Sequence, residues 1–258
     1  MTNRYMTITV TTFCLIILLL GGVILFLSCN KDAIYSDKID IYDYPVKPGT
    51  NEWKAFTSHA DMVSACQIPE NILNKMSTAG LIEAVLNYPL LIDMTAYNSP
   101  QEGFEQVTTQ FNGLQALLNR EDAGSELLAK YNKMEPAEIR NINKETGSYL
   151  LKFQCLELTL SRSSILKKFS QPELRALISK ASIRYREKVQ YELYYGKWGE
   201  ASTALLIGRA LQQAQYDPFM KIISENSDLQ TFINSGFYLN DTDAKVIIYQ
   251  AAEFSNEK

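Results

Sequence analysis

The most constraining feature of the sequence is an apolar run near its start, from Ile8 to Leu27. The run holds no charged side chain, and Arg4 is the only charge before it. A transmembrane helix needs about 20 apolar residues to cross roughly 30 Å of hydrocarbon. A secretory signal needs an apolar core of roughly 7–15 residues with a small residue at its cleavage site. The run is long enough for either, so the rest of the chain is expected to lie outside the cytoplasm.

The residues that end the run favour cleavage. Ser28 is a small residue directly before Cys29, and the charged residues Lys31 and Asp32 follow. This pattern resembles the precursors of bacterial lipoproteins, in which a peptidase cuts before the cysteine and its thiol carries a diacylglycerol. The charged tether is similar to that of surface lipoproteins of the Bacteroidetes. The resemblance implies that Cys29 is lipidated.

An uncleaved membrane helix is the alternative, because Phe26 stands where lipoprotein precursors usually have Leu. Attachment is then through the apolar helix Ile8–Leu27 rather than through a lipid on Cys29. In both cases the domain is expected in the cell envelope, in the periplasm or on the cell surface, at an inner or an outer membrane. The predicted parts are a lipoprotein signal peptide or anchor helix (1–28), a flexible tether (29–49) and a single all-α domain (50–258).

Charge and cysteine content exclude some classes of protein. The 258-residue chain has 25 basic and 29 acidic residues, a net charge of −4, which gives no support to nucleic acid as a partner. After Cys29 only Cys66 and Cys155 remain, too few for a disulfide-rich secreted scaffold. We expect both to be small buried side chains, with a single bridge between them as the alternative.

Apolar residues after residue 50 recur at helical spacing. The strongest series, Tyr149, Phe153, Leu156 and Leu160, steps by 4, 3 and 4 residues within a central helix predicted over 147–169. Ser99-Pro100-Gln101-Glu102 and Ser170-Gln171-Pro172-Glu173 both begin helices with a Ser cap, a proline and a glutamate. Gly196 is expected to end a helix, and Lys245–Ala252, which could also be a strand, is predicted helical. The expected fold is all-α, an irregular multi-helix bundle or a short helical array.

Charge is unevenly distributed along the chain. Residues 51–133 hold five basic and ten acidic side chains, whereas residues 145–192 hold nine basic and five acidic ones. Three of the basic residues are Arg184, Arg186 and Lys188. We interpret the basic residues of 145–192 as a solvent-exposed face that complements the acidic stretch 51–133. The alternative is a patch for an anionic partner, such as a phospholipid headgroup or an acidic glycan.

No catalytic, metal or cofactor motif stands out. His59 is the only histidine, and the sequence has no paired-cysteine spacing and no calcium loop, so no metal site is predicted. No glycine-rich phosphate loop occurs, and no cofactor is predicted. The sequence also has no nucleophile elbow of the kind found in serine hydrolases. Cys66 has no neighbour in sequence that would lower the pKa of its thiol.

Two functions remain open. The first is a non-enzymatic binding or interaction module with a protein or glycan partner. The second is a cell-envelope hydrolase that acts on glycan or peptide through paired carboxylates, for which Asp93, Glu102 and Glu105 are the candidates. A shallow aromatic groove would favour binding, and a deep pocket with two nearby carboxylates would favour hydrolysis.

One further resemblance concerns residues 44–133. Tyr44-Pro-Val-Lys-Pro-Gly-Thr-Asn-Glu-Trp53, Cys66-Gln-Ile-Pro69, Asn87-Tyr-Pro-Leu90 and Phe111-Asn-Gly-Leu114 carry it. The stretch resembles a family of uncharacterised secreted helical proteins from bacteria. No activity follows from this resemblance.

Overall fold

The computed structural model describes residues 40–141 and 146–256, which belong to one compact unit, Ile39–Lys258. Every regular element among these residues is a helix, which confirms the all-α prediction. The apolar run Ile8–Leu27 and Cys29 lie outside the described residues. Among the residues that are described, no helix combines the length and apolar character needed to cross a membrane.

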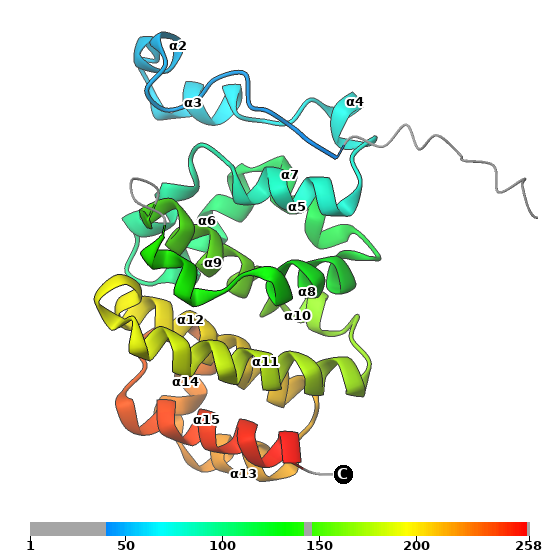
Figure 1. Cartoon of the computed structure of the whole chain (residues 1–258), viewed down its shortest axis with the longest axis vertical. Coiled ribbons are helices and arrows are strands. Elements are labelled where there is room, and N and C mark those ends of the chain that lie inside the picture. The colour runs from blue at the N-terminus through cyan, green and yellow to red at the C-terminus, as the bar shows by residue number, and fades with distance from the viewer. Residues whose placement is uncertain (1–39, 142–145, 257–258) are drawn as a thin grey trace, which may run out of the picture. The chain divides into compact units, whose positions relative to one another are not determined.

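The helices of this unit follow one another in layers (Figure 1). Helix α12 packs on α9, α11 packs on η2, and both α11 and α12 pack on α15. Their bounds are α2 Asn51–Ala55, α3 His59–Ala65, α4 Glu70–Leu73, α5 Thr78–Leu86, η1 Leu91–Ala96, α6 Pro100–Gln110, α7 Asn112–Asn119, α8 Ala123–Lys133, η2 Pro136–Arg140, α9 Thr146–Leu160, α10 Ser163–Leu166, α11 Gln171–Gln190, α12 Glu192–Gln213, α13 Asp217–Glu225, α14 Ser227–Ser235 and α15 Asp241–Asn256.

The two helix starts predicted from a Ser cap, a proline and a glutamate are present in the structure. The Ser99 hydroxyl accepts a hydrogen bond from the backbone N–H of Glu102 and caps α6. Ser170 and Glu173 form a capping box at the start of α11. These side chains satisfy backbone donors that have no partner within the helix. The predicted helix over Lys245–Ala252 is confirmed as part of α15.

The central helix is shorter than predicted. Helix α9 ends at Leu160, and α10 is a separate turn from Ser163 to Leu166. The chain breaks between them at Arg162, whose backbone is extended (φ −67°, ψ 135°) and whose side chain forms an ion pair with Glu105 of α6. Three residues of the predicted stripe, Phe153, Leu156 and Leu160, are fully buried, and the fourth, Tyr149, is only partly buried against the core.

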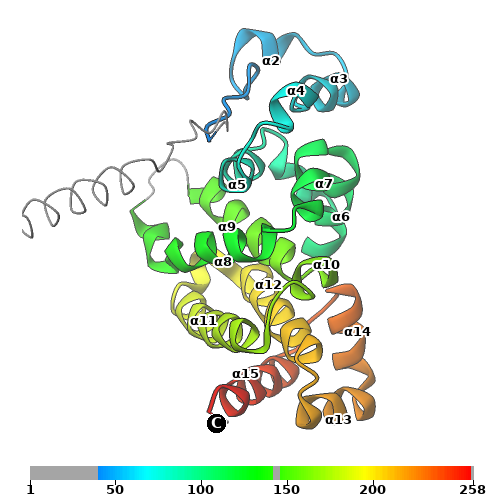
Figure 2. The ribbon, with the colours of Figure 1, turned by 90° about the vertical axis from the view of Figure 1, so that its right-hand side faces the viewer.

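Glycines allow two local features of α12. Gly196 has φ 58° and ψ −178°, a conformation that favours glycine, and it interrupts α12 near its start rather than ending α11. Further along, a Cβ on Gly208 would lie 2.2 Å from Cδ1 of Ile233 in α14. Glycine therefore permits the close approach of α12 and α14, and Figure 2 shows α13 and α14 folded back against α12.

The domain's packing begins before the predicted end of the tether at residue 49. Tyr44 is buried, and its hydroxyl donates to the carbonyl oxygen of Ala84 at 3.0 Å. Its ring contacts those of Tyr88 and Phe111. A large aromatic side chain gains more by packing here than by remaining in a solvated tether, so Tyr44 is part of the packed domain.

The two cysteines of the domain are free and fully buried. Burial raises the pKa of Cys66 to about 11 and that of Cys155 to about 12. Neither thiol has the lowered pKa of a reactive cysteine. The interpretation as small buried side chains is confirmed.

Candidate functional site

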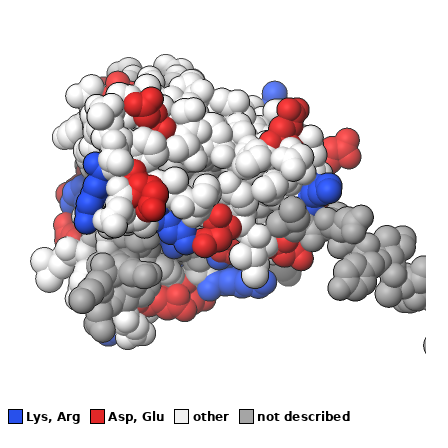
Figure 3. All heavy atoms as spheres, turned by 90° about the horizontal axis from the view of Figure 1, so that it is seen from above, with Lys and Arg blue, Asp and Glu red and all other residues white. Residues whose placement is uncertain are grey.

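Two of the basic residues interpreted as a solvated face are in fact buried. Arg184 and Lys188 are each 1% exposed, whereas Arg186 is exposed. Figure 3 shows one face of the molecule, on which acidic and basic groups are interspersed rather than gathered by sign. Burial of these two cations is possible only because each meets a carboxylate.

Lys188 of α11 lies in a closed polar centre with Glu157 of α9. Its Nζ donates to Glu157 Oε2 at 2.6 Å, to Thr203 Oγ1 at 2.9 Å and to the carbonyl oxygen of Gly199 at 3.2 Å. Glu157 also accepts from Ser202, Thr203 and Tyr131. All three ammonium donors are used, so this centre is structural.

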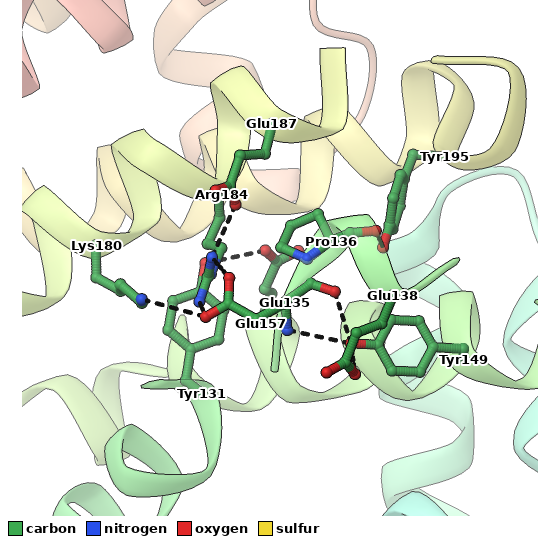
Figure 4. A network of polar contacts seen from close by, with 10 residues as sticks. All are labelled: Tyr131, Glu135, Pro136, Glu138, Tyr149, Glu157, Lys180, Arg184, Glu187 and Tyr195. Atoms are coloured by element: carbon green, nitrogen blue, oxygen red, sulfur yellow. Dashed lines mark hydrogen bonds and ion pairs between the residues drawn. The ribbon is translucent and has the colours of Figure 1, made fainter. Parts of the chain in front are cut away.

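Arg184 forms a second ion-pair group (Figure 4). Its Nη2 donates to Glu135 Oε1 at 2.6 Å, and its Nη1 donates to Glu135 Oε2 and, at 2.8 Å, to Glu187 Oε2. The guanidinium holds the pKa of Glu135 below its usual value. Arg184 therefore joins α11 to the segment before η2 and is not available to a partner.

A polar cleft is the candidate functional site. It has a volume of about 760 Å³ and lies among α6, the turn after α9, α10, α12 and α14. Clefts of this size with a few convergent polar groups are typical of small-molecule sites. Its lining is mainly polar: Gln101, Glu102, Glu105, Ser161, Arg162, Ser163, Ser164, Leu166, Arg209, Gln212, Gln213, Ile233, Asn234 and Ser235.

Both carboxylates of the cleft already have partners. Glu102 accepts from the backbone N–H and from the side-chain amide of Asn98, each at 3.2 Å, at the start of α6. Glu105 accepts from Arg162 Nη1 and from Gln101 Nε2. The predicted candidates Glu102 and Glu105 are thus brought into one cleft, with helix capping and ion pairing as their observed roles.

The third predicted carboxylate lies elsewhere. Asp93 of η1 is not part of the cleft lining, and its Oδ2 lies 2.7 Å from Nε2 of His59, whose side chain is 55% exposed. Asp93 therefore does not join Glu102 and Glu105 as a catalytic group. Among residues 40–141 and 146–256, no three His, Cys, Asp or Glu side chains are grouped so that they could hold a metal ion.

Arg209 of α12 is the cleft residue that the sequence reasoning missed. Its Nε donates to Ile233 O at 2.8 Å, its Nη1 donates to Gln101 Oε1 and Ser161 Oγ, and its Nη2 donates to Asn234 O at 2.9 Å. Burial lowers the pKa of Arg209 to about 10. The signal in the sequence was a lone charge inside the apolar run from Ala204 to Leu211.

The partners of Arg209 are all neutral. Among the described residues it forms no ion pair, and four of the five N–H groups of a guanidinium are used, so one N–H on Nη2 remains. Glu105 acts on Arg209 electrostatically but does not bond to it, and a partly buried cation without a bonded carboxylate favours an anionic group beside it. Arg209 can therefore bind an anionic group of a ligand, and this binding needs no catalytic group.

No protein-family model, no curated protein and no solved structure matches this chain.

Proposed function

We propose that the chain is a membrane-tethered binding protein of the cell envelope whose polar cleft takes a small polar ligand with an anionic group. The observation that carries this proposal is the guanidinium of Arg209, which is partly buried, has only neutral hydrogen-bond partners and retains one N–H donor. Charge-assisted hydrogen bonds from arginine to carboxylate or phosphate are among the strongest polar contacts in proteins.

The rest of the cleft suits the neutral part of such a ligand. Ser163, Ser164, Gln212 and Gln213 line it with hydroxyl and amide groups that can both donate and accept. An acidic sugar has this composition, with one carboxylate and several hydroxyls. The ligand class is therefore the acidic glycan considered in the sequence analysis, recognised at the cleft rather than at a basic surface.

Hydrolysis in this cleft is less well supported. A glycosidase needs one carboxyl group that can give a proton and a second that acts as base or nucleophile. Glu105 is engaged as an acceptor by a guanidinium and an amide. Glu102 accepts from the backbone and side-chain N–H groups of Asn98. Neither carboxyl group is arranged as a proton donor.

Replacing Glu105 with glutamine distinguishes ligand binding from hydrolysis in the polar cleft. Glu105→Gln deletes a negative charge that is paired with Arg162 and acts on Arg209, and that repels an anionic ligand in the cleft. D-glucuronate should therefore bind about tenfold more tightly. Arg162→Gln should weaken binding about tenfold. Calorimetric titration of the full chain with D-glucuronate measures both, with D-glucose as the uncharged control ligand.

Glu83→Gln is the matched control variant, because Glu83 pairs with Lys130 and does not line the cleft. Its affinity for D-glucuronate should equal that of the wild type. If the wild type releases sugar from oligosaccharides and Glu105→Gln abolishes that release, the hydrolase is correct and the binding proposal is wrong.

The attachment to the membrane is a separate part of the proposal. Cleavage before Cys29 and acylation of its thiol follow from the Ser28-Cys29 pattern after an apolar run. Two or more acyl chains hold a protein stably on a membrane, whereas one chain is marginal. Lipid on Cys29 would therefore replace the apolar helix as the anchor.

Cys29→Ser tests the anchor, because it removes the acceptor thiol and leaves the apolar run intact. The wild type should lose residues 1–28 and incorporate labelled palmitate. The variant should keep the full precursor mass and remain unlabelled. If both proteins run at full length, unlabelled and membrane-bound, Ile8–Leu27 is a plain membrane helix and the lipoprotein proposal fails.

A further inference from the structure

A second groove lies among α11, α12 and α15, away from the polar cleft. Its volume is about 700 Å³. Tyr185 and Val189 of α11, Glu200 of α12 and Ile248 and Tyr249 of α15 are among its lining residues. A volume of this size is within the range of small-molecule sites.

Glu200 is an incompletely paired carboxylate in this groove. It is 4% exposed, and its Oε2 accepts a hydrogen bond from Lys197 Nζ at 3.2 Å. Its Oε1 is buried and has no hydrogen-bond partner among the described residues. A buried acceptor without a donor costs free energy, so a donor from outside would be stabilised here.

The two cations that act on Glu200 are shared with other carboxylates. Lys188 interacts with Glu200 electrostatically but is bonded to Glu157. Besides Glu200, Lys197 Nζ lies 3.4 Å from Glu192 and 3.8 Å from Asp241, so one ammonium serves three carboxylates. Arg186 and Lys245 also line the groove, but both are exposed and neither bonds to Glu200. Water and salt screen exposed charges more strongly than buried ones.

The walls suit the carbon chain of an amine. Val189 and Ile248 are apolar, and Tyr249 is 61% exposed. Aromatic faces attract cations, and methylene stems pack along apolar surface while the charged end meets a polar group.

We propose that this groove binds a small alkylamine, whose ammonium donates to Glu200 Oε1 and whose methylenes lie on Val189, Ile248 and Tyr249. The site is independent of the polar cleft and of its proposed function. The ammonium completes the pairing of Glu200, and the apolar wall selects an aliphatic chain over a bare cation.

Saturation-transfer NMR on the full chain in detergent tests this with 1,5-diaminopentane as the probe and 1-pentanol as its uncharged counterpart. The methylenes of the diamine should receive saturation, and those of the alcohol should not. Glu200→Gln should weaken diamine binding about tenfold or more. Tyr249→Ala, at an exposed position that the fold does not need, should weaken it about two- to fivefold.

Glu253→Gln is the matched control, because Glu253 is an exposed carboxylate of α15 outside the groove lining. It should bind the diamine like the wild type. Equal saturation of alcohol and diamine, or unchanged binding by both Glu200→Gln and Tyr249→Ala, would overturn the proposal. Binding of a lysine-containing peptide without binding of the diamine would also overturn it, because the occupant would then be a protein.

Discussion

Glu157→Gln is expected to lower the free energy of unfolding by about 3–5 kcal/mol, because it leaves Lys188 charged and fully buried without a counterion. The other ligands of the ammonium, Thr203 and Gly199, are neutral. Chemical denaturation of the purified protein measures the loss. A loss below about 1 kcal/mol would mean that the pair is not desolvated as described.

The loss should depend on pH. Burial lowers the pKa of Lys188, and Glu157 opposes this effect. In Glu157→Gln the charge of Glu157 no longer raises the pKa of Lys188. The folded variant therefore releases the proton of Lys188 at a lower pH than the unfolded chain does. Between these two pKa values the unfolded chain binds more protons, and stability rises with pH. The difference in the free energy of unfolding between the wild type and Glu157→Gln should therefore become smaller as the pH is raised from neutrality toward the pKa of a free lysine.

Two further variants separate the buried pair from ordinary ion pairs. Replacing Lys188 with methionine in the Glu157→Gln background should recover much of the loss, since no buried charge remains. Glu83→Gln, which breaks the partly exposed ion pair with Lys130, should cost no more than about 1 kcal/mol. Equal losses from Glu157→Gln and Glu83→Gln would contradict the explanation.

Phe153→Ala is expected to cost about 3–5 kcal/mol, the usual range for a buried phenylalanine. Phe153 is fully buried, and its ring packs edge-on against Tyr131, Tyr149 and Tyr195. Lys188 Nζ lies 4.3 Å from its ring centroid. The truncation removes both the packing and a face on which the buried ammonium rests. Denaturant unfolding provides the measurement.

Leu193→Ala is the control for this truncation, since Leu193 is fully exposed on α12. It should change stability by no more than about 0.5 kcal/mol. Phe153→Ala and Glu157→Gln should not be additive, because both act on Lys188. A small effect of Phe153→Ala would show that α9 is not the centre of the core.

Local signals were enough to predict much of the fold. Serine caps and the spacing of Phe153, Leu156 and Leu160 act within a few residues, so the sequence displays them directly. Arg162, at the break, pairs with Glu105, which lies 57 residues away. The burial of Lys188 depends on Glu157, 31 residues away. A helical pattern cannot show which distant carboxylate a basic residue will meet, so a long helix and a solvated face were predicted instead.

The candidate site was predictable only in part for the same reason. Glu102 and Glu105 lie on one helix turn, so their shared cleft follows from local spacing. Arg209 bonds to Gln101, which is 108 residues away, and this contact exists only after α12 has packed beside α6. Asp93 was predicted as a candidate together with the two glutamates, but it lies on η1 and its carboxylate bonds to His59 instead.

The polar centre around Glu157 has a consequence for the register of the helices. It joins α8, α9, α11 and α12 through Tyr131, Lys188, Ser202 and Thr203. A slip between apolar faces costs packing but leaves no charge unpaired. A shift of α11 by one turn, about 5.4 Å, would instead strand an ammonium and a carboxylate in an apolar environment. The charged centre thus selects one alignment of four helices, and variants that make it wholly apolar should gain alternative alignments even where they keep their stability.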